Sequence, residues 1–206
     1  MQKILASRWF WPSVGLIIGL IAVFFLGRAV LPHRFAGTVV QSPKTAADFT
    51  LTGAGDVPVS LSDFRGRVVL LYFGYTACPD ICPTTLLELM KALDLLGGKA
   101  AQVQVIMVSV DPEKDTPQRL DAYLRNLDPA ERLIGLTGSQ DQIQEAATQY
   151  GVFYQKRENA ETSLSYLVDH TATVMLIDRK GYLRVVYPYG TPADGIASDL
   201  RYILRK

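Results

Sequence analysis

The segment Val68-Val-Leu-Leu-Tyr-Phe-Gly-Tyr-Thr-Ala-Cys-Pro-Asp-Ile-Cys-Pro83 begins with a continuous apolar run and ends with two cysteines four positions apart. Such a run is typical of a strand that is covered on both faces of a sheet. The amphipathic residues 84–96 that follow predict a helix. The segment therefore predicts a strand, a loop and a helix, with Cys78 and Cys82 at the helix entrance.

The elements around this segment extend the same plan. Residues 103–110 form a second apolar run and predict another buried strand. Capping residues or a Thr-Pro pair predict three further helices: residues 116–126, 139–151 and 191–204. Apolar runs around turn residues predict two hairpins: residues 49–60 near the amino terminus and residues 173–187. Strands that alternate with helices and end in a hairpin and a helix predict a thioredoxin-like, three-layer α/β sandwich, with the dithiol at the carboxyl end of a central strand.

Near the amino terminus, residues 9–27 carry no charge and lie between Arg8 and Arg28. At about 1.5 Å per residue this run covers about 28 Å, close to the ~30 Å hydrocarbon core of a bilayer. It predicts a single transmembrane helix that anchors the protein. A cleaved signal peptide is the alternative, because Lys3 and Arg8 also form a basic amino-terminal region.

The chain is expected to contain a membrane anchor over residues 1–30, a tether over residues 31–45 and one domain over residues 46–206. The formal net charge of +1 gives no basic excess for binding nucleic acid. Because the anchor begins too early to leave room for a transit peptide, we expect the inner membrane of a bacterium, with the domain facing the periplasm or outside.

Cys78 and Cys82 are the only cysteines of the chain. The positive end of a helix dipole favours the thiolate over the thiol, and thiolates serve both soft-metal binding and disulfide chemistry. Disulfide oxidoreductases mostly use a Cys-x-x-Cys spacing, which is one residue shorter. Residues i and i+4 share a helical face, so both sulfurs can converge on one ion. The spacing favours a metal but leaves a redox-active disulfide open, and two buried packing cysteines are the structural alternative.

The third candidate ligand is His170, since the other histidine, His33, lies in the tether. In a thioredoxin-like topology the predicted strand 173–178 neighbours the dithiol strand, and its entry loop faces the cysteines. Thr171 and Ala172 stand where thioredoxins place a cis-proline. Two thiolates and one imidazole suit Cu(I), and with a further ligand Cu(II), whereas structural zinc usually takes four protein ligands. A lone histidine is otherwise more often an ordinary surface or core residue.

Other polar residues near the predicted site are weaker candidates. Asp111 follows the second buried strand and either supports a ligand or caps a turn. Asp80 lies between the thiols and either adds negative charge to the site or is a solvated loop residue. Tyr72 and Tyr75 either rim the site or, as we expect, are core aromatics. Residues 155–167 are polar and mostly aperiodic, and predict a flexible loop before His170.

The motifs together closely resemble the Sco/SenC family over residues 46–204. The resemblance rests on the cysteine segment and on three others: Val108-Ser-Val-Asp-Pro-Glu-Lys-Asp-Thr-Pro117, Asp169-His-Thr171 and Tyr187-Pro-Tyr-Gly190. It implies a membrane-anchored copper protein of thioredoxin fold that helps to assemble the binuclear copper site of cytochrome c oxidase. It also implies copper ligands at Cys78, Cys82 and His170. Many relatives have a histidine at the position of Ala77, which is not a ligand in the family.

The sequence therefore predicts a copper metallochaperone that binds and delivers its metal and is not an enzyme. Its expected partners are the copper-bearing oxidase subunit and other periplasmic copper chaperones or thiol reductases. The alternative function is a thiol–disulfide reductase that keeps the cysteines of that subunit reduced, with Cys78 and Cys82 as its redox pair. A peroxidase is disfavoured, because no cysteine elsewhere in the chain could act as a distant resolving thiol.

Overall fold

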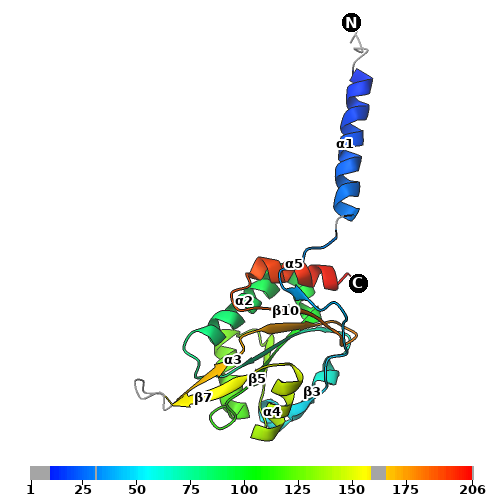
Figure 1. Ribbon diagram of the computed structural model, residues 1–206. Coiled ribbons are helices and arrows are strands. Elements are labelled where there is room, and N and C mark those ends of the chain that lie inside the picture. Colours follow the sequence, from blue (N-terminus) through cyan, green and yellow to red (C-terminus); the bar gives the residue numbers. More distant parts are fainter. Residues whose placement is uncertain (1–9, 31, 159–165, 206) are drawn as a thin grey trace. The chain divides into compact units, whose positions relative to one another are not determined.

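The computed structural model describes residues 10–30, 32–158 and 166–205 (Figure 1). The chain divides into two compact units, Met1–Arg34 and Phe35–Lys206. The second unit contains the β-sheet and both cysteines.

The first unit contains the helix α1 (Phe10–Val30). Among the described residues, no helix combines the length and the apolar character needed to cross a membrane. The prediction of a transmembrane anchor over residues 9–27 is therefore wrong, and so is the single-pass inner-membrane location that depended on it.

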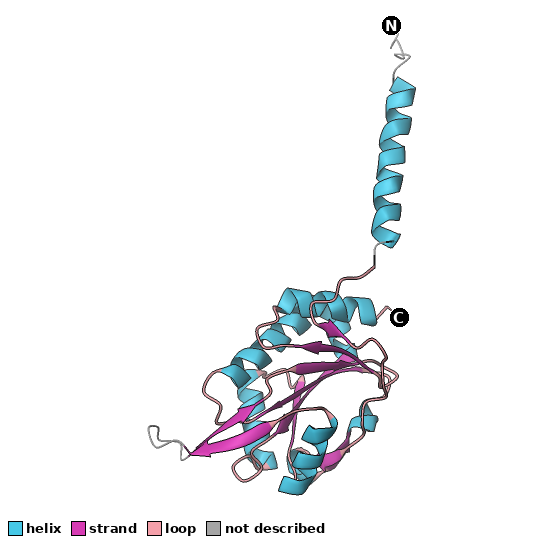
Figure 2. Cartoon of the chain, viewed as in Figure 1, coloured by secondary structure: helices cyan, strands magenta, loops and turns pink. Residues whose placement is uncertain are grey.

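The second unit is built on a six-stranded sheet with the order β1-β10-β9-β4-β5-β6 (Figure 2). Its strands are β1 (Thr38–Val39), β4 (Val68–Gly74), β5 (Val103–Ser109), β6 (Leu133–Leu136), β9 (Val174–Ile177) and β10 (Leu183–Tyr187). Strands β4, β5 and β6 are parallel, whereas β9 runs antiparallel to β4. Every residue of β4 and β5 is buried, as their continuous apolar runs predict for central strands.

Helices cover both faces of this sheet. They are α2 (Ile81–Leu96), α3 (Pro117–Leu127), α4 (Gln140–Gln149) and α5 (Ala193–Ile203). Adjacent residues of β4 point to opposite faces. On one face, Tyr72 hydrogen-bonds side chains of α2; on the other, the Phe73 ring lies 5.9 Å from the ring of Tyr150, directly after α4. Helix α5 packs beside α2, so the prediction of a thioredoxin-like three-layer sandwich is confirmed.

The helix starts follow the capping signals in the sequence. The hydroxyl of Thr116 accepts the backbone N–H of Arg119 at 3.2 Å, with proline at the first helical position of α3. Ser139 and Gln142 form a reciprocal capping box at the start of α4. Both caps satisfy N–H groups that the first helical turn leaves without a partner.

The predicted hairpins are present. Strand β2 (Thr50–Thr52) pairs antiparallel with β3 (Pro58–Ser60), and β9 pairs antiparallel with β10. Three short 3-10 helices complete the described connections: Ala54–Asp56, Leu61–Phe64 and Gly97–Gln102. The amino-terminal hairpin is therefore confirmed.

The predicted loop over residues 155–167 is wrong in its described part. Strand β7 (Tyr154–Glu158) pairs antiparallel with β8 (Tyr166–His170), while residues 159–165 lie outside the described part of the chain. The sequence signal is weak because the pair forms a separate two-stranded sheet. The described side chains of β7 alternate between half-buried and exposed instead of forming an apolar run, and in β8 the described side chain of Val168 is buried.

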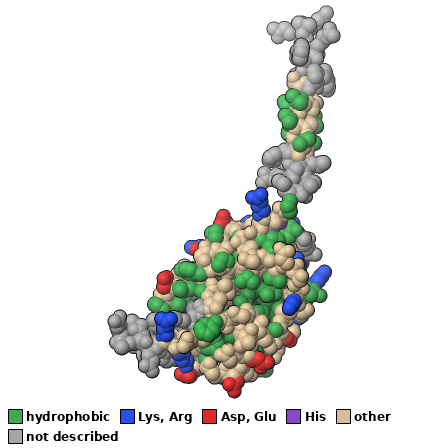
Figure 3. Space-filling model, viewed as in Figure 1, with side chains coloured by type: hydrophobic (Ala, Val, Ile, Leu, Met, Phe, Trp, Pro, Cys, Tyr) green, Lys and Arg blue, Asp and Glu red, His purple; other side chains and the backbone are tan. Residues whose placement is uncertain are grey.

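Charged side chains lie mainly around the rim of the second unit on the face shown in Figure 3, with hydrophobic ones nearer its middle. Opposite charges pair locally, as where Arg132 binds Asp128 at 2.9 Å and Asp94 at 2.6 Å. Arg125 likewise pairs with Asp121, one helical turn away. Basic and acidic groups of the second unit are thus paired with one another.

Candidate metal centre

The two cysteines occupy the junction between β4 and α2. Strand β4 ends at Gly74 and α2 begins at Ile81, so Cys78 lies in the loop and Cys82 in the first helical turn. The backbone N–H of Cys82 donates to Sγ of Cys78 at 3.3 Å. Both residues are thiols and are not joined by a disulfide. The fold therefore brings the two sulfur-bearing side chains together, as the spacing predicted.

Their environments differ. Cys78 is half-buried, whereas Cys82 is 0% exposed. The side-chain hydrogen bond with Cys78 is the largest cause that raises the pKa of Cys82, followed by burial of the thiol. The expectation that the helix entrance favours a thiolate is therefore wrong for Cys82 in this thiol pair, because the hydrogen bond with Cys78 and the burial of the thiol raise its pKa.

Two buried tyrosines contact the thiols. The hydroxyl of Tyr72 hydrogen-bonds the side chain of Cys82, and that of Tyr75 hydrogen-bonds the side chain of Cys78. Burial is the largest cause that raises the pKa of Tyr75 to about 12, and the two cysteines add to the rise. Both phenols stay protonated at neutral pH and can donate to sulfur. Both rings are buried, as expected of core aromatics, and both hydroxyls also border the thiols, the alternative that the sequence left open.

Tyr75 also ties the cysteine loop to β8. Its hydroxyl accepts the backbone N–H of Val168 at 3.2 Å, and its carbonyl accepts the N–H of Cys78 at 3.3 Å. Val168 is two positions before His170 in the same strand. The backbone of β8 is therefore fixed to the loop that carries Cys78.

His170 ends β8 and pairs with Tyr154 of β7. Its backbone is described, but its side chain lies outside the described part of the structure. The described side chains contain no group of three or more histidine, cysteine, aspartate or glutamate residues placed to hold a metal ion, and the imidazole of His170 is not among them. The meeting of His170 with the two sulfurs stays a prediction.

A second loop borders the site at the carboxyl end of β5. The N–H of Val110 donates to the carbonyl of Gly74 at 2.8 Å. The fully buried Asp115 accepts the N–H of Thr76 at 2.9 Å and its hydroxyl at 2.5 Å. Asp115 was not among the residues predicted from the sequence, because an acidic residue just before a helix resembles an ordinary capping residue.

The comparisons with known proteins identify the family. A family model described as SCO1/SenC matches residues 38–205. The chain belongs to this family. It is similar to the solution structure of apo Sco1 from Thermus thermophilus, with 44% identity and a TM-score of 0.73 over 82% of this chain and 97% of that one. Copper-bound ScoI of Arabidopsis thaliana gives 32% identity and a TM-score of 0.72, over 79% and 99% of the two chains.

A third similar structure is that of BsSco, a Sco-family cytochrome c oxidase assembly protein in which a disulfide switch was identified. It is 28% identical, with a TM-score of 0.59, over 80% of this chain and 96% of that one. The family predicted from the four sequence motifs is thus confirmed.

The remaining candidates of this SCO1/SenC chain lie near the cysteine loop or at its border. Asp80 is exposed and accepts the hydroxyl of Thr84 at 3.3 Å. Asp111 is buried, and its backbone carbonyl accepts the N–H groups of Lys114 and Asp115 in a turn. Ala77 is half-buried against the core.

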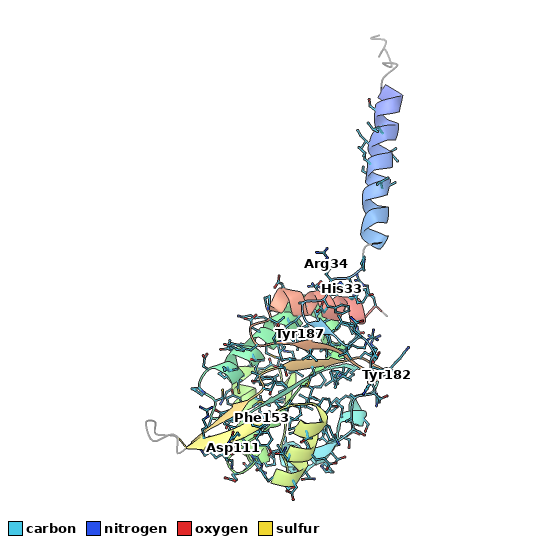
Figure 4. All side chains as sticks on the ribbon, viewed as in Figure 1. His33, Arg34, Asp111, Phe153, Tyr182 and Tyr187 are labelled. Atoms are coloured by element: carbon cyan, nitrogen blue, oxygen red, sulfur yellow. The ribbon has the colours of Figure 1, made fainter. Side chains whose placement is uncertain are left out.

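The segment after β5 is linked to β7 by the ion pair of Lys156 with Glu113 at 2.5 Å. Figure 4 labels Asp111, which lies on that segment, and Phe153, which directly precedes β7.

Proposed function

We propose that this chain binds copper and delivers it during assembly of the copper centre of cytochrome c oxidase, with the copper-bearing oxidase subunit as the recipient. The observation that carries the proposal is the pair of adjacent thiols at the β4–α2 junction, where the N–H of Cys82 reaches Sγ of Cys78. Membership of the SCO1/SenC family supports it, as do the similarity to a copper-bound ScoI and to BsSco, an oxidase assembly protein.

The proposed ligands are the thiolates of Cys78 and Cys82 and the imidazole of His170. Two sulfurs and one nitrogen form a soft donor set that suits Cu(I). The hydrogen bond from Val168 to Tyr75 supports the third ligand, because it fixes the strand of His170 to the cysteine loop. Metal ligation requires deprotonated cysteines, so loading with copper releases the thiol protons, against the raised pKa of Cys82.

Delivery then proceeds by ligand exchange, without a covalent step on the protein. Cys78 is half-buried and Cys82 is buried, so an incoming ligand from the recipient reaches the Cys78 side of the metal first. The donor hydrogen bonds from Tyr72 and Tyr75 orient the sulfurs and reduce the charge on them, as groups around metal ligands commonly do.

Metal analysis of the full chain, purified reduced and without oxygen, tests this proposal. We expect about one copper per chain, and loss of copper in Cys78→Ser, Cys82→Ser and His170→Ala, since each removes one ligand of a low-coordinate site. Tyr182→Phe, a change on the exposed end of the β9–β10 hairpin, is the control and keeps its copper. Full copper retention in His170→Ala would rule out the proposed third ligand.

A thiol–disulfide reductase that keeps the recipient's cysteines reduced is the second candidate. It is favoured by the adjacent thiol pair and by the similarity to BsSco with its disulfide switch. His170→Ala separates the two functions, because it removes a metal ligand but leaves both thiols. Reduction of a recipient disulfide that persists in this variant, with no copper bound by the parent chain, would establish the reductase instead.

A further inference from the structure

Asp115 is a fully buried carboxylate between β5 and α3 that the proposed copper chemistry does not use. Its Oδ2 accepts the N–H of Thr76 at 2.9 Å and the hydroxyl of Ser109 at 2.6 Å. Its Oδ1 accepts the hydroxyl of Thr76 at 2.5 Å. Arg119 lies at the exposed side, 3.8 Å from Oδ1, and donates to the hydroxyl of Thr76 at 3.1 Å.

These bonds join two loops at the same edge of the sheet. Thr76 is two residues before Cys78, in the loop after β4, and Ser109 is the last residue of β5. The carboxylate thus holds the start of the cysteine loop against the end of the neighbouring parallel strand. The backbone contact from Val110 to Gly74, at 2.8 Å, lies beside it.

We propose that Asp115 is a positioning residue that holds the cysteine loop in the conformation in which Cys78 and Cys82 act as a thiol pair and chelate one metal ion. A buried carboxylate is costly unless it is hydrogen-bonded, and bonds to a charged acceptor are shorter and stronger than neutral ones. The anchor is therefore rigid. A loop ordered in advance loses less conformational freedom when it binds a ligand.

The inference has a part that rests on the proposed copper function and a part that does not. If copper binds Cys78 and Cys82, loosening the loop weakens its affinity. Independently of metal, the anchor stabilises the thiol form against the disulfide. In that reaction both cysteines lose their protons and together two electrons, forming one S–S bond, while one oxidised glutathione is reduced to two glutathione molecules.

The test compares Asp115→Asn with the matched control Asp128→Asn in the full chain. Asp128 is also a buried, hydrogen-bonded carboxylate, but its partner is Arg132, away from the cysteine loop. Two quantities are measured: the equilibrium with glutathione buffers without metal, and the Cu(I) affinity by competition with a chromophoric chelator. For Asp115→Asn we expect a shift of about tenfold toward the disulfide, equivalent to about 30 mV for a two-electron couple.

The Cu(I) affinity of Asp115→Asn should fall by about ten- to a hundredfold, the usual effect of losing a group that supports metal ligands. Asp128→Asn should leave both quantities within about twofold of the parent, although it also lowers stability. Equal effects of the two variants on both measurements, or no effect of Asp115→Asn on either, would overturn the inference. If Asp115→Asn shifts the disulfide equilibrium but the parent chain binds no copper, the positioning role of Asp115 is supported and the proposed copper function is wrong.

If Asp115→Asn fails to fold, a milder pair of variants provides a second test. Thr76→Val removes the hydroxyl that donates to Oδ1 but keeps the backbone N–H bond, whereas Thr76→Ser keeps both. We expect Thr76→Val to shift the disulfide equilibrium in the same direction as Asp115→Asn, and Thr76→Ser to restore the parent value. A Thr76→Val variant that folds and matches the parent in both quantities would contradict the anchor.

Discussion

Gly74 is packed closely against the sulfur of Cys82 and the ring of Tyr72. A Cβ at this position would lie 2.7 Å from Cε1 of Tyr72 and 3.1 Å from Sγ of Cys82. The first distance is far below a van der Waals contact, and the atoms belong to fully buried side chains. The buried thiol can therefore occupy its position only because residue 74, at the end of β4, has no side chain.

Gly74→Ala should displace the Cys82 sulfur and the Tyr72 ring. We expect a loss of about 1–3 kcal/mol in the free energy of unfolding, as for other overpacked cores, measured by urea denaturation, together with weaker Cu(I) binding. Gly98→Ala is the control, because a Cβ there meets nothing within 4 Å. A Gly74→Ala chain with the parent's stability and copper affinity would show that this end of β4 is loosely packed.

Asp128 gives a pH-dependent contribution to stability. Burial raises the pKa of its carboxyl, but the side-chain and backbone hydrogen bonds from Arg132 together outweigh burial and lower it. A carboxyl with a lowered pKa in the folded state stabilises the fold above its ordinary value of 3.8, and that stabilisation is lost as the pH falls through the folded value.

Asp128→Asn should therefore be less stable than the parent by about 1–3 kcal/mol at neutral pH, since a buried charged partner is lost. The difference should shrink as the pH falls below the carboxyl's ordinary value. Urea denaturation of both chains across this range measures it. A difference that stays constant with pH would mean that the carboxylate charge contributes nothing.

Among the secondary-structure elements, the β7–β8 hairpin is held to the cysteine loop by the Tyr75 hydroxyl. Tyr75→Phe keeps the ring and removes this bond. We expect faster amide hydrogen exchange at Val168 and its neighbours in β8, because local opening of the strand becomes easier, and weaker Cu(I) binding by severalfold.

The matched control is Tyr150→Phe, which also removes one tyrosine hydroxyl, the donor to the carbonyl of Ala47 at 2.7 Å. It should leave exchange in β8 unchanged. Protection of Val168 that is equal in Tyr75→Phe and in the parent would show that other contacts hold the hairpin.

The elements differ in how well sequence predicts them, for physical reasons. Strands β4 and β5 are buried on both faces, so their apolar runs are unambiguous. Helices α3 and α4 carry their own capping residues. Strands β7 and β8 form a separate two-stranded sheet, and the described side chains of β7 are half-buried or exposed, so polar residues are tolerated and the pattern resembles a loop. The contacts of Asp115 and Tyr75 join residues 39 and 93 positions apart, and no local pattern encodes them.

For the whole molecule, the motifs predicted the family and the fold, and the spacing of the cysteines predicted their meeting. The placement of the His170 side chain stays a prediction, whereas the membrane anchor, predicted from the uncharged run of residues 9–27 and implied by the family resemblance, is contradicted. The prediction of copper as the metal agrees with the copper bound in the similar ScoI structure.

Loading with Cu(I) should stabilise the entire fold, because a ligand that binds only the native state shifts unfolding by mass action. At about one hundred times the dissociation constant the gain is about 2.7 kcal/mol, seen as a higher melting temperature. Cys78→Ser should show no such rise. An equal rise in that variant would place the bound copper elsewhere on the chain.

The unequal burial of the two sulfurs also affects how the chain meets electrophiles. A bulky maleimide approaching from solvent encounters Cys78 in its loop, while Cys82, in the first turn of α2, is fully buried. Brief labelling of the native chain should therefore attach a single tag, at Cys78. Such selective tagging would provide an attachment point for a spectroscopic probe beside the intact buried thiol.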